Sequence, residues 1–341
     1  MSKVLSVCVP SYNMEKYLNR CIDSFLVPEV LDRLELIIVN DGSTDNTLSI
    51  ANEYKTKFPQ TIVVIDKPNG HYGSCVNASL KVATGKYFRI VDADDWVDSN
   101  ALVTFINKLE NIDVDCVCTK HTVHDLNESN IRVQTYEATF ETPLNMNEID
   151  VPIECLFMHD LSYSTQLLKL IEYDQTEGIC YTDNEYVYFP LSCSKNILFL
   201  DISLYQYYIG RDTQSMAPEV LRKNYNHFVI VLNKIYNGHG FSLPFNTNEK
   251  RIWINFLSGL SFRIVPMYLL FHKYDKKTDN LLRLSILQLR KEEDGLCEKL
   301  FDSTVLKIPY VSIWFSLPFL SKHLFPIMHL LRWLTTKINH A

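Results

Sequence analysis

The rest of the chain is organised around Lys86-Tyr87-Phe88-Arg89-Ile90-Val91-Asp92-Ala93-Asp94-Asp95-Trp96. Its apolar part, residues 87–91, predicts a buried strand, and three carboxylates follow within four residues. In an open α/β sheet, such strand ends face the crevice in which ligands bind. Carboxylates this close together repel one another, and their oxygens are ligands that suit Mg²⁺ or Mn²⁺. The alternative is a solvated acidic turn in which Asp94 or Asp95 caps a helix that starts near Trp96.

The composition is that of an ordinary globular chain. Its 341 residues are 47% hydrophobic and 21% charged, which fits one large domain or two smaller ones. The formal net charge of -7 argues against nucleic acid as a partner. The nine cysteines include no Cys-x-x-Cys pair, so we expect reduced, mostly buried thiols and a cytoplasmic location. No charged and apolar leader precedes the apolar run 4–9, and we expect no secretory signal.

Strand and helix patterns alternate through the first hundred residues. Buried strands are predicted at 4–9, 36–39, 62–65 and 87–91, and helices at 14–26, 46–58 and 73–83. Asn13 is predicted as the N-cap of the first helix. Strands that alternate with helices pair in parallel through right-handed crossovers, which predicts a doubly wound, mostly parallel sheet. Further strands are expected at 114–118, 131–140 and 199–209, before helices over 217–300.

The glycine-rich phosphate motifs are absent from this pattern. The first strand is followed by Pro10-Ser11-Tyr12-Asn13 rather than Gly-x-Gly-x-x-Gly, and the chain has no Gly-Lys-Ser/Thr loop. A dinucleotide oxidoreductase and a P-loop enzyme are therefore disfavoured. Instead, polar or acidic residues follow three of the strands, at 11–13, at Asp41 and at 92–95. Together they predict one polar crevice.

The N-terminal hundred residues resemble the inverting family 2 glycosyltransferases of the bacterial surface-polysaccharide type. The segments that match in content, order and spacing are Val9–Asn13 with Lys16–Leu18, Glu35–Asp45 and Gly85–Asp98. The resemblance implies the GT-A fold, an α/β, Rossmann-like sheet, with a mainly helical C-terminal region. It also implies transfer of a hexose or N-acetylhexosamine from a UDP-sugar donor to a hydroxyl of a glycan or lipid-linked glycan.

The same resemblance implies how the nucleotide is held. Tyr12 would pack its ring on the base, the alternative being a buried core tyrosine. Asp41 would accept a hydrogen bond from the uracil imide, and it could also simply form an Asp-Gly turn. Other positions implied to contact the donor are Pro10, Asn13, Asn69 and Ala93.

The acidic turn corresponds to the DXD motif of the family. Asp94 would be the main contact of a Mn²⁺ or Mg²⁺ ion, while Asp92 would contact the metal, a metal-bound water or the ribose. Asp95 would support this group or cap a helix. The metal would bridge the two phosphates and stabilise the leaving diphosphate.

One segment departs from the family pattern. Many members carry an Ala-Arg-Asn triplet whose arginine helps to hold the nucleotide, but the matching position here is Val76, before Asn77. Lys67 or His71 could take its place, although a histidine in a surface loop needs no such role.

An inverting transfer needs a general base, which the family places at the start of a helix some ninety residues past the DXD motif. Asp183 is our candidate; the alternative is a helix cap, and Glu185 is the reserve. Thr182 stands where the family more often has an acidic residue. Arg211 is expected to bind the diphosphate or to form an ordinary salt bridge, beside a Gly210 that would permit a mobile lid.

The sequence predicts three regions. Residues 1–215 would be the glycosyltransferase domain, with its nucleotide-sugar half at 1–100 and its acceptor half at 101–215. Residues 216–304 would be helical, and 305–341 form a tail of aromatic and basic residues. Such a tail fits peripheral attachment to the inner face of the cytoplasmic membrane, or packing on the domain or on another subunit of a homo-oligomer.

Two other functions remain open from sequence. A catalytically silent nucleotide-binding scaffold would explain the missing arginine and Thr182. A sugar-1-phosphate nucleotidyltransferase shares the sheet type but needs a glycine-rich loop that residues 10–13 do not supply.

Overall fold

The computed structural model describes residues 2–125, 131–146, 156–209, 218–238, 247–292 and 295–338. The chain divides into two compact units, residues 1–214 and 215–341. Each unit is described by itself.

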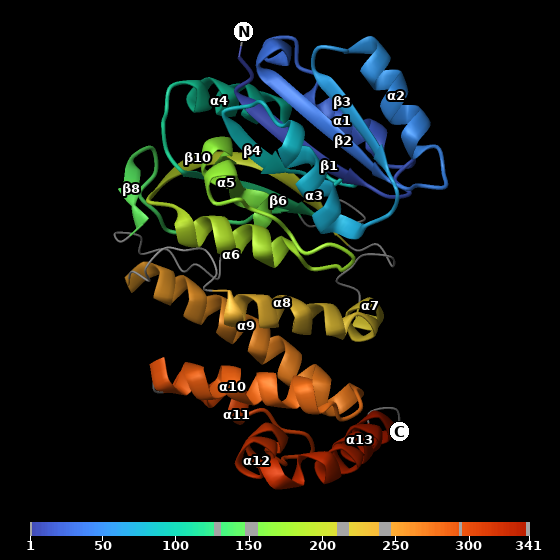
Figure 1. The fold of residues 1–341 in the computed structure, drawn as a ribbon, viewed down its shortest axis with the longest axis vertical. Helices are drawn as coiled ribbons and strands as arrows, with labels where there is room; N and C mark the ends of the chain where they lie inside the picture. Colours follow the sequence, from blue (N-terminus) through green and yellow to red (C-terminus); the bar gives the residue numbers. More distant parts are fainter. Residues whose placement is uncertain are drawn as a thin grey trace. The chain divides into compact units, whose positions relative to one another are not determined.

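The N-terminal unit is built on a sheet that has ten strands within the described residues (Figure 1). The strands are β1 Leu5–Ser11, β2 Leu34–Asp41, β3 Ile62–Lys67, β4 Tyr87–Ile90, β5 Trp96–Val97, β6 Cys116–His124, β7 Ile131–Val133, β8 Pro143–Asn145, β9 Leu161–Ser164 and β10 Asn196–Tyr208. Their order is β3-β2-β1-β4-β9-β6-β10-β5, with β7 on β6 and β8 on β10.

The predicted α/β class is confirmed, and the sheet is mixed. Strands β3, β2, β1 and β4 pair in parallel, as the alternation of strands and helices predicts. Strand β9 then inserts antiparallel between β4 and β6, while β6 and β10 again pair in parallel. The antiparallel pairs therefore come from the second half of the unit, where the sequence pattern is weakest. The predicted strand 131–140 is reduced to the three residues of β7.

Helices pack around this sheet (Figure 1). They are α1 Leu18–Phe25, α2 Thr47–Lys57, α3 His71–Val82, α4 Ser99–Glu110, α5 Thr165–Leu170 and α6 Asp183–Cys193, with a 3₁₀ turn, η4, at Met158–Asp160. Buried apolar residues of β1, β2, β4 and α1 and α4 form one core, which includes Leu36, Phe25 and Phe105. The acidic turn after β4 is thus carried on a fully buried strand.

Two predicted helix caps are wrong. Asn13 has a φ of 55° and lies well before α1, and its Oδ1 accepts a hydrogen bond from Thr44 N at 2.9 Å. Asn13 therefore joins the ends of β1 and β2 instead of capping a helix. The cap of α4 is Asp98, whose carboxylate accepts from Ala101 N at 2.8 Å, so neither Asp94 nor Asp95 has this structural role.

The C-terminal unit is helical, as predicted. Its elements are α7 Pro218–Lys223, α8 Tyr225–Asn237, α9 Thr247–Phe271, α10 Lys276–Glu292, α11 Glu298–Phe301, α12 Tyr310–Ser316, the 3₁₀ turn η5 Pro318–Leu320 and α13 Ser321–Ile338. Among the described helices, α9 alone is long and apolar enough over 250–271 to cross a membrane. Its side chains Leu257, Ile264 and Tyr268 are fully buried between neighbouring helices, so α9 also serves as the core helix of this unit.

The aromatic tail is part of the same helical unit. Arg283 of α10 is buried, pairs with Asp279 at 2.9 Å, and donates to Trp314 O at 2.7 Å and to Ser321 Oγ at 2.6 Å. Trp314 in turn donates its indole N–H to Asp279 at 2.7 Å. These bonds fix the end of α12 and the start of α13 to α10.

Candidate functional site

The acidic turn after β4 is held from β10. Asp95 is 1% exposed, and its carboxylate accepts hydrogen bonds from Tyr205 Oη at 2.6 Å and Tyr208 N at 2.8 Å. Tyr205 Oη also accepts from Asp92 N at 3.2 Å. Burial, and then the nearby Asp92 charge, hold the pKa of Asp95 well above its usual range. A bound cation would relieve that repulsion.

The carboxylate of Asp92 is contacted from α3. Tyr72 Oη donates to Asp92 Oδ1 at 2.9 Å and lies 3.0 Å from Met158 Sδ of η4. Tyr72 therefore joins α3, the acidic turn and η4, the three segments that meet at this point.

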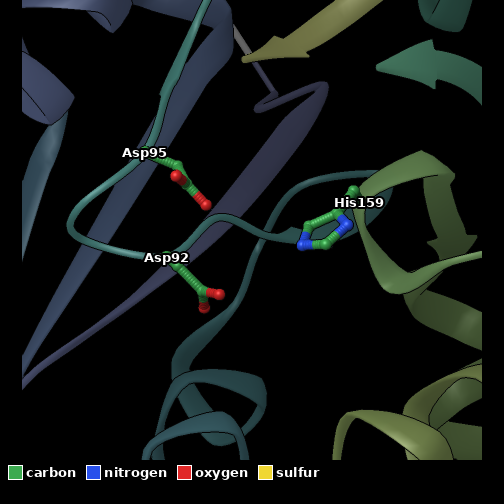
Figure 2. A group of neighbouring side chains, drawn as sticks. All are labelled: Asp92, Asp95 and His159. Carbon is green, nitrogen blue, oxygen red and sulfur yellow. The ribbon is translucent and has the colours of Figure 1, made fainter. Parts of the chain in front are cut away.

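His159 completes a group of three potential ligands (Figure 2). One ligand atom each from Asp92, Asp95 and His159 lie within 4.8 Å of one another. Among the described residues, His159 Nδ1 is buried without a hydrogen-bond partner. Burial, and then His121, lower the pKa of His159 well below its usual range, so the imidazole is neutral and can donate a lone pair.

This donor set fits a divalent cation. Carboxylate oxygens suit Mg²⁺ and Mn²⁺, and an imidazole nitrogen adds a preference for a transition ion such as Mn²⁺. Asp94, the expected main contact, is half-buried and is not in the group of three; its backbone O accepts from Arg20 Nη2 at 2.8 Å. Arg20, in α1, also lies over the Trp96 ring, 3.9 Å from its centroid, and so connects the turn to α1.

A buried polar network holds η4 in place behind His159. Arg89 of β4 is fully buried, and its guanidinium donates to His159 O and to Ser162 Oγ, the latter at 3.1 Å. Asp160 pairs with His121 at 2.7 Å. Such a network specifies one position for η4, because each buried polar group needs its partner.

Tyr12, which directly follows β1, is 48% exposed, so the alternative of a buried core tyrosine is wrong. Asp41 is 3% exposed, and its Oδ1 accepts from Lys67 Nζ at 2.6 Å and Gly70 N at 2.9 Å. Gly42, with a φ of 72°, forms the expected Asp-Gly turn as well. Lys67 is therefore the cation nearest the expected uracil contact, while the side chain of Val76 is fully buried and points away from solvent.

The other residues that were expected to contact the sugar donor differ in their exposure. Pro10 is half-buried within β1, and Asn69 is exposed beside Gly42. Ala93 is buried. Arg211 and Gly210 lie outside the described residues.

Asp183 is the first residue of α6, directly after the N-cap Thr182. Its charge, with that of Asp92, raises the pKa of Tyr72 well above its usual range, although burial is the larger cause. Burial, followed by Asp95, Asp92 and Asp183, likewise raises the pKa of Tyr207 to about 12. The charges of Asp92 and Asp183 thus both act on these two tyrosines, so the two carboxylates lie near the same side chains. Glu185 is fully buried and accepts from Thr176 N at 2.9 Å, so the reserve candidate has a structural contact.

A polar clamp connects the start of α6 to α3. The Asn77 amide donates to Gln175 O at 2.9 Å and accepts from Gln175 N at 2.8 Å. The side chain of Gln175 then donates to Thr182 O at 2.9 Å, one residue before Asp183. Gly73 permits this approach, since a Cβ there would lie 2.3 Å from Thr176 O.

Sequence patterns missed Tyr72, His159, Arg20 and Gln175. Tyr72 lies in the segment where Val76 replaces the arginine of the family pattern. This departure from the pattern is the one signal that could have identified Tyr72 as a site residue. His159 follows a stretch of prolines and acids without period, and only the three-dimensional structure brings it to Asp92.

Comparisons with known proteins identify the family of the N-terminal part of the chain. Residues 6–170 match the family model described as glycosyl transferase family 2. The glycosyltransferase GlyG of Streptococcus pneumoniae is 33% identical over 130 residues, 38% of this chain and 43% of that protein. The poly(ribitol-phosphate) beta-glucosyltransferase of Bacillus spizizenii is 38% identical over 107 residues, 30% of this chain and 17% of that protein. The match thus spans less than half the length of these relatives.

A solved structure shows the same fold over most of the chain. The S. aureus TarS 1–349 structure in complex with UDP-GlcNAc matches with a TM-score of 0.57 and 20% identity, covering 92% of this chain and 91% of that chain. The expected fold is confirmed by this likeness.

Proposed function

Residues 6–170 belong to glycosyl transferase family 2, with the GT-A fold, and we propose that the chain is an inverting glycosyltransferase that uses a UDP-sugar. The acceptor is a hydroxyl of a surface glycan, free or lipid-linked. The names of the relatives support this class, since they include a poly(ribitol-phosphate) beta-glucosyltransferase and the chondroitin synthase of Pasteurella multocida. The UDP-GlcNAc in the TarS complex supports a UDP-sugar donor.

One observation carries the proposal: the oxygen and nitrogen ligands of Asp92, Asp95 and His159 converge at the end of β4. The charge of Asp183 acts on Tyr72, the tyrosine that donates to Asp92. A site with a cation-binding group next to a second carboxylate suits transfer from a diphosphate donor to a hydroxyl. The exposed ring of Tyr12 would cover the base, and Asp41 would contact the uracil when Lys67 gives up part of its contact.

The cation would be held by Asp92, Asp95 and His159, with Asp94 as the further contact that the family resemblance implies. When bound, Mn²⁺ or Mg²⁺ neutralises the charge that develops on the departing diphosphate. The chain's own part is to hold these ligands rigidly, through Tyr72 and Tyr205 on the acidic turn and through Arg89 behind η4.

Asp183 would accept the proton of the attacking hydroxyl. The oxygen then bonds to the anomeric carbon as the bond to the diphosphate breaks, which inverts the configuration. Gln175 and Asn77 fix the peptide that precedes Asp183, so the carboxylate keeps its position during the attack.

The test is release of UDP by the purified chain from UDP-glucose, UDP-galactose, UDP-GlcNAc and UDP-GalNAc, with GDP-mannose as the control donor. A polyol-phosphate polymer and a lipid-linked saccharide serve as acceptors, with Mn²⁺, Mg²⁺ or EDTA. We expect acceptor-dependent UDP release from one UDP-sugar, its loss in EDTA, and an inverted anomer by NMR. A retained anomer contradicts the inverting mechanism, and binding of UDP without turnover of any donor supports a silent scaffold.

A further inference from the structure

Helix α13 has two faces with different surroundings. One face packs on the end of α9: the Phe325 ring lies 4.8 Å from that of Tyr268, and Arg332 lies over Phe271 at 4.0 Å. His329 of the same face makes a 2.9 Å hydrogen bond with the backbone O of His272. The contacts of this face are therefore made within the helical unit.

The opposite side of α13 is apolar and exposed. Ile327, Leu330 and Trp333 are 51%, 56% and 54% exposed, and Phe319 in the preceding turn η5 is 78% exposed. Positions three apart lie on one side of a helix, so the three α13 side chains form a stripe. We call these four residues the tail face. Single exposed apolar residues are common, but a stripe of three on one side of a helix, with an exposed phenylalanine in the turn before it, marks an interaction surface.

The segment that carries the tail face differs in charge from the rest of the chain. Residues 303–341 contain four basic residues, Lys307, Lys322, Arg332 and Lys337, and no aspartate or glutamate, whereas the whole chain has a net charge of -7. Lys322, at the start of α13, is exposed. The segment that carries the tail face is therefore basic, although the chain as a whole is acidic.

We propose that the tail face docks on an anionic lipid bilayer. Apolar and aromatic side chains would enter the headgroup boundary, and lysines would meet the lipid phosphates. A twofold contact between two tail faces would bring two acid-free, basic segments together, which disfavours a second copy as the occupant. The contact is of the peripheral kind, since the stripe occupies one face of α13 and the other face is buried.

Two other aromatic residues of the segment take no part in this surface. Trp314 and Phe325 are buried, Trp314 beneath Arg283 and Phe325 against Tyr268, so they stabilise the unit instead of meeting lipid. This inference does not depend on the glycosyltransferase activity, because it concerns only residues of the C-terminal unit.

Flotation of the full-length chain with vesicles tests the proposal. The wild type is compared on phosphatidylglycerol–phosphatidylcholine and on pure phosphatidylcholine vesicles, at low and high salt. The variant is Ile327→Ser/Leu330→Ser/Trp333→Ser. Its matched control is Leu284→Ser/Leu287→Ser, two apolar residues of α10 that are 49% and 53% exposed.

We expect binding to anionic vesicles that weakens at high salt, a loss of about tenfold or more in the triple variant, and no loss in the control. Lys322→Glu should weaken binding to anionic vesicles only. Unchanged melting temperatures show that the exposed substitutions leave the fold intact. Equal flotation of wild type and triple variant overturns the proposal. The proposal is also overturned if the wild type is a dimer, the triple variant is a monomer, and the two float equally.

Discussion

Tyr72 donates a 2.9 Å hydrogen bond to Asp92, and the same hydroxyl lies 3.0 Å from Met158. This one side chain therefore connects the start of α3, the acidic turn after β4 and the segment that carries His159. Tyr72 belongs to none of the family segments that identified the site from sequence.

Replacement of Tyr72 by phenylalanine should loosen Asp92 without altering the fold. Because a hydrogen bond to a charged group contributes roughly 1.5–3 kcal/mol, we expect the Mn²⁺ concentration for half-maximal UDP release to rise about tenfold. The control is Tyr54→Phe, which removes an exposed 2.6 Å hydrogen bond from Tyr54 of α2 to Asp23 of α1. Equal metal dependence of the two variants argues against the role of Tyr72.

His159→Ala should weaken Mn²⁺ binding directly. Loss of a ligand, or of a group that orients one, typically costs about 10–100-fold in metal affinity. Calorimetric titration of Mn²⁺ into the protein checks this, with Asp94→Asn alongside and His323→Ala as an exposed control in the other unit. If Asp94→Asn weakens binding and His159→Ala does not, the metal is held by the DXD carboxylates alone.

Asn77→Ala should slow transfer while leaving donor binding intact. The substitution removes two bonds that fix Gln175, and with it the peptide before Asp183. We expect kcat to fall about tenfold or more, since small displacements of a catalytic group are costly, while the Kd for the UDP-sugar stays unchanged. Asn52→Ala, exposed on α2, is the control. A changed Kd with normal kcat would instead make Asn77 a donor contact.

Acid should destabilise the helical unit through His272. Burial, and then His329, lower the pKa of His272 from 6.5 to about 4. The unfolded chain therefore binds the proton first, and stability falls as pH drops through 6.5 towards 4. Melting of the C-terminal unit followed between pH 7.5 and 4 should show this slope, and His272→Gln should reduce it. The same slope in that variant would assign the effect to other groups.

The sequence predicted the strands and helices whose apolar residues follow a regular local period. The buried strands 36–39 and 87–91 and the helix near 46–58 follow from apolar periodicity, and the structure has them within a few residues. The antiparallel insertion of β9 was not predictable, because its four residues pair with β4 and β6 through contacts distant in sequence.

The candidate site also has residues that could be predicted from sequence and residues that could not. Asp92, Asp41 and Asp183 stand in recognisable motifs, so their positions could be predicted from sequence. His159 lies near Asp92 because contacts distant in sequence hold η4, among them the bond from the buried Arg89 to the backbone of His159. A side chain that is positioned by a distant buried network leaves no periodic signal in its own segment.

The variant Asp183→Asn tests whether Asp183 is the general base. The amide keeps the shape of the side chain but cannot accept the acceptor's proton at neutral pH. We predict that Asp183→Asn binds the UDP-sugar and Mn²⁺ with wild-type affinity by calorimetry, while acceptor-dependent UDP release falls by about 100-fold or more. Near-normal transfer by Asp183→Asn, with the same affinity for donor, would contradict the central claim.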